Sequence, residues 1–171
     1  MDREMFYTKN TIGISIWEKE NLNLALELWG DSEVTKFIGG PFSSEEVKKK
    51  LNVEIKRLKD NNVQYYPIFD IEKGVFIGSG GLREYCLEKG IYEIGFHLKK
   101  EFWGKGYGTK VANLIIEYAF KEKKIKTLFA GHNPNNIISS KVLAKLGFKY
   151  TGKEFYKPTG LLHPSYILEK N

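Results

Sequence analysis

Cysteine and long apolar runs are scarce in this sequence. Cys86 is the single cysteine, and no apolar run is long enough to span a bilayer. One cysteine excludes an intramolecular disulfide and fits a reducing compartment. The stretch 1–5 lacks the apolar core of a signal peptide. We therefore expect a soluble, cytoplasmic protein with no membrane partner.

Internal repeats, linkers, low-complexity tracts, zinc-finger spacings and basic repeats are missing as well. At 171 residues, with 42% hydrophobic and 28% charged residues, the chain is expected to form a single domain, 1–171. The net charge of +6 fits either a lysine-rich solvated surface or attraction to an anionic partner. We attribute most of the lysines to the surface and expect no specific nucleic-acid partner.

The apolar periodicity predicts an α/β fold of the mixed α+β type, with helices on a mostly antiparallel sheet of about seven strands. Three strands follow one another in a meander, which excludes a doubly wound array. The expected strands are 11–17, 64–71, 75–85, 91–98, 127–132, 148–156 and 165–169. The expected helices are 21–29, a short turn within 31–38, 43–59, one from about Gly106 to 120, and 136–146.

Three glycines at alternate positions, Gly104, Gly106 and Gly108, join the expected strand 91–98 to the following helix. Without a Cβ, backbone N–H groups can approach a bulky oxyanion, and the first turn of a helix has N–H groups without partners. Such a join favours a phosphate or pyrophosphate. The alternative is a purely structural turn between a strand and a helix. The glycine spacing matches neither of two known phosphate-binding motifs, the dinucleotide fingerprint and the P-loop.

A second cluster, 136–148, follows one strand later and would place Asn136, Ser139 and Leu143 on one helical face. With this cluster the sequence resembles the GNAT superfamily of acetyl-CoA-dependent N-acetyltransferases, most closely its RimJ/RimL-like branch. The resemblance covers most of the chain and keeps the order of the family. The matching segments are 28–39, 92–96, 103–109 and 136–148.

The resemblance implies acetyl-CoA as co-substrate, with no metal, in a sheet that is splayed at the cofactor cleft. Gly95 occupies the position where the family has a distortion that splays this strand from the next. Asn136 would bond the pantetheine arm, and Ser139 would face the thiol end. The coenzyme A pyrophosphate would be held by backbone N–H groups of Lys105, Gly106, Tyr107, Gly108 and Thr109. The pantetheine arm would pair, as an extra strand, with the backbone of Phe96, His97 and Leu98.

Acetyl transfer needs a group that removes a proton, because an alkyl ammonium has a pKa of about 10.4 and no free lone pair. Glu93 is our candidate base, and a structural acid holding a loop is its alternative. His97 could instead be the base or a plain sheet histidine. Leu143 occupies the position where many family members have a tyrosine, so Ser139 is our candidate acid; a capping serine is the alternative.

These inferences predict an N-acetyltransferase in which a primary amine attacks acetyl-CoA directly, in a ternary complex. The acceptor is a protein N-terminus or a small amine, and the enzyme is a monomer or homodimer. The alternatives are a coenzyme A-binding regulatory protein with little turnover and a basic nucleic-acid-binding module. The tail residues His163, Tyr166 and Tyr156 could line the acceptor side. An acidic pocket, favouring a polyamine or aminoglycoside, could come from Glu45, Glu46, Glu54, Asp70 and Glu84.

Overall fold

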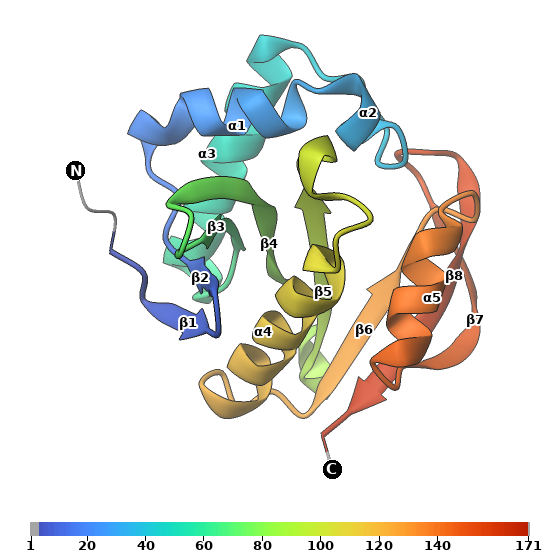
Figure 1. The fold of residues 1–171 in the computed structure, drawn as a ribbon. Helices are drawn as coiled ribbons and strands as arrows, with labels where there is room; N and C mark the ends of the chain where they lie inside the picture. The colour runs from blue at the N-terminus through green and yellow to red at the C-terminus, as the bar shows by residue number, and fades with distance from the viewer. Residues whose placement is uncertain (1–3, 171) are drawn as a thin grey trace.

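The computed structural model describes residues 4–170, which form an eight-stranded sheet with helices on both faces (Figure 1). The spatial order is β1-β2-β3-β4-β5-β6-β8-β7, and every neighbouring pair is antiparallel except β5–β6. The strands are β1 Tyr7–Lys9, β2 Ile12–Ile14, β3 Tyr65–Asp70, β4 Val75–Cys86, β5 Ile91–Leu98, β6 Thr127–Gly131, β7 Lys149–Tyr156 and β8 Leu161–Glu169.

The α-helices are α1 Leu22–Trp29, α2 Ser32–Thr35, α3 Ser44–Asn61, α4 Tyr107–Lys121 and α5 Ile137–Lys145. Short 3₁₀ turns, η1 Lys19–Asn21, η2 Leu87–Lys89 and η3 Lys100–Phe102, precede α1, β5 and the glycine join. Local signals set the bounds of α3: Ser43 and Glu46 form a capping box at its start, and Asn62 ends it in the left-handed conformation. Among residues 4–170, no helix is apolar and long enough to cross a membrane.

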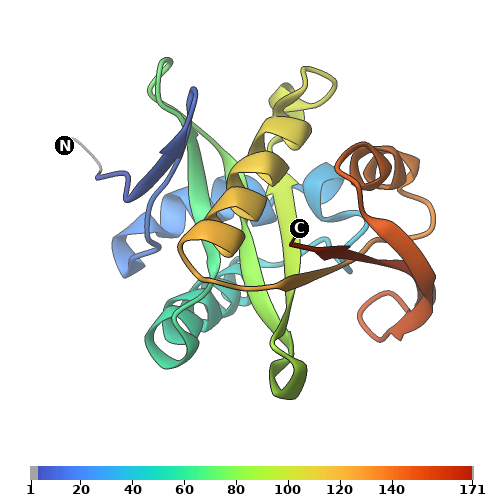
Figure 2. The same cartoon turned by 90° about the horizontal axis from the view of Figure 1, so that it is seen from below.

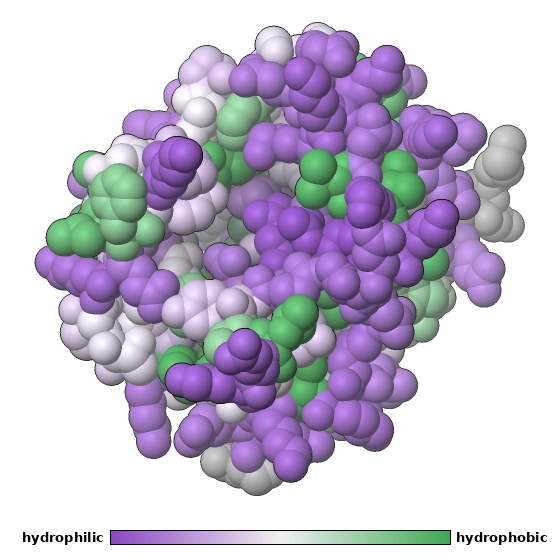
Figure 3. All heavy atoms as spheres, turned by 180° about the vertical axis from the view of Figure 1, so that it is seen from behind, coloured by the Kyte–Doolittle hydropathy of each residue, from purple (hydrophilic) through white to green (hydrophobic). Residues whose placement is uncertain are grey.

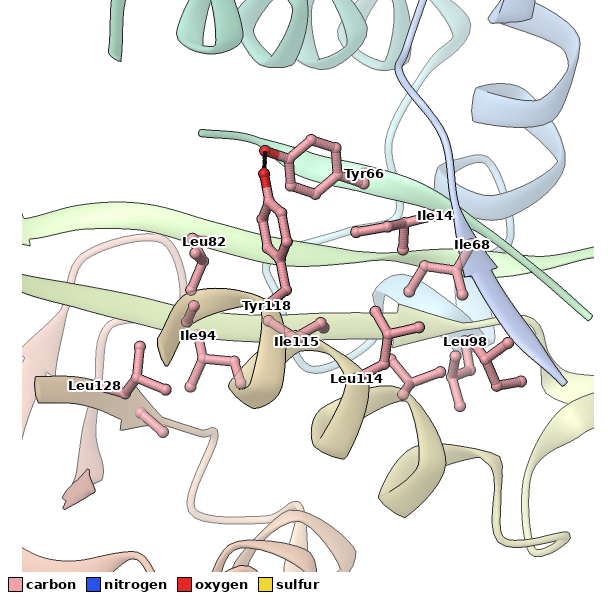
Figure 4. Packing of buried hydrophobic residues seen from close by; sticks show 14 of the residues in the cluster. Ile14, Tyr66, Ile68, Leu82, Ile94, Leu98, Leu114, Ile115, Tyr118 and Leu128 are labelled. Carbon is pink, nitrogen blue, oxygen red and sulfur yellow. Dashed lines mark hydrogen bonds between the residues drawn. The ribbon is translucent and has the colours of Figure 1, made fainter. Parts of the chain in front are cut away.

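Two hydrophobic layers sandwich the sheet. The first lies between the sheet and α4, where Leu114 and Ile115 pack against Ile94, Leu98 and strand residues from β2 to β6 (Figure 4). The second lies on the opposite face, under α1 and α3, and contains Trp17, Trp29, Leu51 and Phe76 among others. Figure 2 shows α4 crossing the sheet with α1 and α3 away from it. The mixed α+β fold predicted from the periodicity is therefore confirmed.

The sheet divides where its two parallel strands part. β5 and β6 pair over three residue positions, from Ile91 opposite Thr127 to Glu93 opposite Phe129. Beyond Glu93, residues 94–98 of β5 have no partner on β6, and the two strands diverge (Figure 1). The edge of β5 therefore presents unpaired backbone groups next to the glycine join, as the expected splay requires.

The strand predictions need three corrections. The sheet has one strand more than the seven expected, because β1 is three residues long and carries no apolar alternation. The strand expected at 11–17 is confined to Ile12–Ile14, and the one expected at 165–169 begins at Leu161. The expected single domain covers 1–171, and residues 1–3 and 171 of it lie outside the described residues.

Candidate active site

The glycine join forms an open start for α4. Gly104 and Gly106 adopt φ angles of +69° and +81°, the left-handed conformation that glycine tolerates best. Gly106 is the N-cap of α4, and no side chain of residues 4–170 bonds this helix start. The positive end of the helix and its uncapped N–H groups form a site that suits a phosphate group. The phosphate-binding interpretation thus has the geometry it requires.

The side chain of Tyr107 fixes the join to the β3–β4 hairpin. Its hydroxyl donates to Asp70 Oδ2 over 2.6 Å and accepts from Lys73 Nζ over 2.8 Å. Burial alone would raise the pKa of Asp70, but the bonds from Tyr107 and Lys73 bring that pKa below its ordinary value. Tyr107 can therefore offer a ligand only its backbone, and Asp70 is engaged away from any acceptor pocket.

The three candidate residues at the end of β5 differ in what they offer. Phe96 packs against the α4 layer, and its ring lies 3.5 Å from where a Cβ on Gly108 would stand. Leu98 is buried, and its carbonyl oxygen accepts a 2.8 Å bond from the indole Nε1 of Trp103. Trp103 thus uses one lone pair of the Leu98 carbonyl oxygen. This carbonyl lies at the end of the strand edge where we expect the pantetheine arm to pair.

At the start of α5, Asn136 is the N-cap residue of the helix. Its Oδ1 accepts from the backbone N–H of Ser139 over 3.3 Å, which leaves the amide nitrogen of Asn136 as the group able to donate elsewhere. Ser139 is half-buried one turn into the helix. Leu143 packs against the hydrophobic core and supplies no proton donor.

Glu93 lies at the last paired position before β5 and β6 part, opposite Arg83 on β4. Burial raises the pKa of this carboxyl, the positive charges of Arg83 and Arg57 oppose the rise, and the negative charge of Glu154 adds to it. A carboxylate with a raised pKa is a stronger base than an ordinary glutamate. Burial and the charge of Glu154 therefore make Glu93 a stronger base than an exposed glutamate, and its role as the base stays a prediction.

Gly95 has a different role from the distortion expected there. The pairing of β5 with β4 continues without a shift through Gly95, and the strands β5 and β6 part already after Glu93. A Cβ on Gly95 would stand 2.1 Å from the hydroxyl oxygen of Tyr65. Gly95 therefore provides the space in which the buried phenol of Tyr65 crosses β4 to reach β5.

A buried charge network holds Tyr65 and Arg83 in place. The guanidinium of Arg83 lies 3.7 Å from the centre of the Tyr65 ring and donates to Glu54 over 2.7 Å. Glu54, 2% exposed, also accepts from the Tyr65 backbone over 2.9 Å and pairs with Arg57 at 2.9 Å. Arg57 in turn bonds Glu84. Glu54 and Glu84 are thus committed to arginines, so the expected acidic pocket cannot include them as free carboxylates.

The environment of His97 removes it as a base. Its Nδ1 accepts from the indole Nε1 of Trp29 over 3.2 Å, so the proton of the neutral ring is on Nε2. Burial, together with the positive charges of Arg83 and Lys50, lowers the pKa of His97 to about 3. A neutral ring whose lone pair already accepts a bond is a structural sheet histidine, the second of the two alternatives.

Of the tail residues, Tyr156 ends β7. Burial raises its pKa, the positive charge of Arg83 opposes the rise, and the negative charge of Glu93 adds to it. Next to it on β7, Glu154 accepts a 2.6 Å bond from Tyr85.

Of the other two expected tail residues, His163 packs against Tyr156, with their ring centroids 4.7 Å apart, and lies opposite Glu154. His163 is buried against Thr159, at 2.8 Å, and Tyr166 stacks on His132.

Four residues near Glu93 or His97 were not predicted from the sequence. One local signal was present in the sequence: Arg83 is a charged residue within a predicted strand, two positions after Gly81 and therefore on the same face. The rest depends on contacts far apart in the chain. The missed residues are Trp29, Tyr65, Arg83 and Glu154.

The acceptor side is bordered by a contact between the chain after α2 and the β7–β8 turn (Figure 1). A Cβ on Gly39 would stand 3.0 Å from the carbonyl oxygen of Pro158, and Asn133 Nδ2 donates to the Phe37 carbonyl over 3.4 Å. The face opposite α4 is hollowed near its centre, and hydrophilic residues predominate around the hollow (Figure 3).

Comparison with known proteins agrees with this geometry. Residues 12–149 match the family model of the acetyltransferase (GNAT) domain. YnaD of Bacillus subtilis, described as an uncharacterized N-acetyltransferase, is 30% identical over 154 residues, which cover 90% of this chain and 86% of YnaD.

Two solved structures share the fold. A GNAT-family acetyltransferase from Bacillus anthracis has a TM-score of 0.81 at 25% identity, covering 96% of this chain and 98% of its own. RimL, a ribosomal L7/L12 alpha-N-protein acetyltransferase solved with coenzyme A, has a TM-score of 0.80 at 16% identity, covering 97% and 98%. With its splayed sheet and open glycine join, this chain belongs to the GNAT acetyltransferase family.

Proposed function

We propose that this protein transfers an acetyl group from acetyl-CoA to a primary amine, with both substrates bound together. One observation carries the proposal: the unpaired edge of β5, residues 94–98, lies between the glycine join and Glu93. The join suits the diphosphate, the edge suits an extended amide-bearing arm, and Glu93 suits the amine. The coenzyme A bound to the fold neighbour RimL supports this assignment.

The residues present fit acetyl-CoA. Backbone N–H groups from Lys105 to Thr109 would hold the diphosphate, because the left-handed Gly106 leaves the start of α4 uncapped. Backbone groups of Phe96 and His97 would pair with the pantetheine arm, and the Asn136 amide nitrogen would donate to it. When bound, acetyl-CoA supplies a thioester carbonyl that is open to attack by an amine.

Glu93 takes the proton that the ammonium must lose before it can react. The raised pKa of Glu93 strengthens it as a base, while the positive charge of Arg83 opposes the rise. Tyr65 and its charge network keep Arg83 in position. We assign to the hydroxyl of Ser139, half-buried in the first turn of α5, the proton that the leaving thiolate takes up. We infer a cytoplasmic enzyme that needs no metal and acts as a monomer or homodimer.

Thiol release measured with a panel of amines and peptides tests the proposal. Glu93→Gln should lower kcat/KM by about a hundredfold, the scale of a lost general base. Glu88→Gln, an exposed glutamate in η2, is the matched control and should leave the rate unchanged. No thiol release with any acceptor would contradict the enzymatic proposal.

A coenzyme A-binding regulatory protein is the second candidate, and the partly buried Leu143 favours it because no hydroxyl is present at that position. This candidate predicts tight coenzyme A binding, no thiol release, and no effect of Glu93→Gln on any measured function. Calorimetry with coenzyme A next to the thiol assay separates the two candidates.

A further inference from the structure

A basic cavity lies at the C-terminal end of α4, away from the glycine join. It opens between the end of α3, the turn into β5 and the connection from α4 to β6, and its volume is about 360 Å³. A volume of this order suits a small ligand. Because α4 has 15 residues, the cavity lies roughly 22 Å from the join at the other end of the helix. The cavity is therefore separate from the candidate acetyl-CoA site.

Four lysines line this cavity, and no acidic residue within 4–170 does so. Glu88 and Glu122 adjoin these lysines in the chain but are not part of the lining. Figure 1 shows the connection from α4 to β6 beside the start of β5, where Ile91 pairs with Thr127. The fold thus brings together lysines from separate segments: Lys89, Lys123, Lys124 and Lys126.

The fold itself uses little of this positive charge. Among the described residues, Lys89, Lys124 and Lys126 form no ion pair and no side-chain hydrogen bond. Lys123 is half-buried, and its Nζ donates to the carbonyl oxygen of Asn62, which leaves two of its three donors for a ligand. The ends of α3 and α4 carry roughly half a negative charge each. Together they balance about one positive charge, fewer than four lysines supply.

The chain reverses at one residue of each segment that lines the cavity. Asn62, Gly90 and Lys124 have φ angles of +57°, +65° and +57°, all in the left-handed region. Asparagine and glycine adopt this conformation more readily than lysine does. Replacing Lys124 by asparagine therefore removes a charge from the cavity and retains the turn.

A concave site lined by positive charges attracts anions, and a lysine ammonium binds phosphate oxygens as a point charge. Burial lowers the pKa of the Lys123 ammonium, because its charged form has lost part of its hydration. A bound anion would replace that hydration. Lysines that line one cavity suit a ligand with several negative charges in a small volume. A chain of two or three phosphates has this chemistry.

We propose that this cavity binds a compact polyphosphate. The inference goes beyond the proposed acetyl transfer, and its test needs no turnover. Free inorganic triphosphate and the triphosphate of a nucleotide present the same chemistry, so the test uses both sources.

The experiment is calorimetry on the full chain with coenzyme A in slight molar excess, at low salt. Sodium tripolyphosphate and ATP are each titrated, beside inorganic phosphate, which should bind at least tenfold more weakly. Lys124→Asn should raise the Kd for tripolyphosphate about tenfold to a hundredfold, the scale of a lost charged hydrogen bond, and leave the urea midpoint unchanged or higher. Lys48→Gln removes the same charge from an exposed position near the other end of α3 and should leave the Kd unchanged.

Equal affinity for tripolyphosphate and ATP would assign the site to the phosphate chain alone, and tighter binding of ATP would assign it to a nucleotide. No heat with either ligand would overturn the proposal. An unchanged Kd in Lys124→Asn, or an equal loss in Lys48→Gln, would place the binding elsewhere on the surface. Inorganic phosphate binding as tightly as tripolyphosphate, or a short RNA duplex binding more tightly than both triphosphates, would also contradict a compact polyphosphate site.

Discussion

Gly95→Ala is the substitution whose effect on folding the structure specifies most closely. The new Cβ would stand 2.1 Å from the hydroxyl oxygen of Tyr65 and 2.8 Å from its Cζ. Tyr65 cannot withdraw easily, because it is 3% exposed, its backbone N–H bonds Glu54, and Arg83 covers its ring at 3.7 Å. Overpacking of this kind costs about 3 kcal/mol of unfolding free energy.

A double-mutant cycle with Tyr65→Phe tests the stated cause. Phenylalanine removes the 2.1 Å contact and leaves the 2.8 Å contact, so Gly95→Ala should cost about 1–2 kcal/mol less in that background. The assay is urea unfolding, with a lower midpoint at an unchanged m-value. Gly131→Ala is the control, since its Cβ would meet Phe129 at 3.6 Å, an ordinary contact. Costs that add within about 0.5 kcal/mol would refute the assignment of Gly95 to the Tyr65 phenol.

Two further predictions concern buried polar groups. His97 has a folded pKa of about 3, so between pH 6.5 and 3 the unfolded chain binds a proton that the folded chain does not. Stability is therefore present above pH 6.5 and is lost as pH falls; His97→Gln should flatten this dependence by about 1.4 kcal/mol per pH unit, and parallel urea midpoints of both proteins from pH 6 to 4 would contradict this. Tyr107→Phe leaves the buried Asp70 without its 2.6 Å donor and should cost about 1–3 kcal/mol in urea unfolding, with weaker coenzyme A binding in calorimetry. Tyr92→Phe is the matched control, and an equal loss in both variants would show that the Asp70 bond contributes nothing.

What the sequence could predict depends on how local the signal is. The glycine join and the start of α3 are set by neighbouring residues, so their positions could be predicted from the sequence. β1 was not predicted because a strand of three residues is too short to show an alternation of apolar and polar residues.

The acceptor side could not be predicted because long-range packing builds it. The bond between Trp29 and His97 joins residues 68 positions apart, and it decides that His97 is not a base. The passage of Tyr65 over Gly95 depends on the register of three strands, which spacing in the sequence does not determine. Glu54 likewise changes from a candidate pocket acid to the centre of a charge network only when α3 packs against β4.

Because β5 and β6 diverge, the sheet has a weak line of backbone pairing between these two strands, which we call the seam. Between β5 and β6, three residue positions of backbone pairing join the part from β1 to β5 to the part made of β6, β8 and β7. A ligand arm that pairs with residues 94–98 would lie between the two parts and would hydrogen-bond the strand edge that β6 leaves unpaired. When its free concentration is a hundred times its Kd, such a ligand adds about 2.7 kcal/mol to the free energy of unfolding. The bound co-substrate would then stabilise the join between the two parts of the sheet, and this stabilisation would be lost and regained once in every turnover.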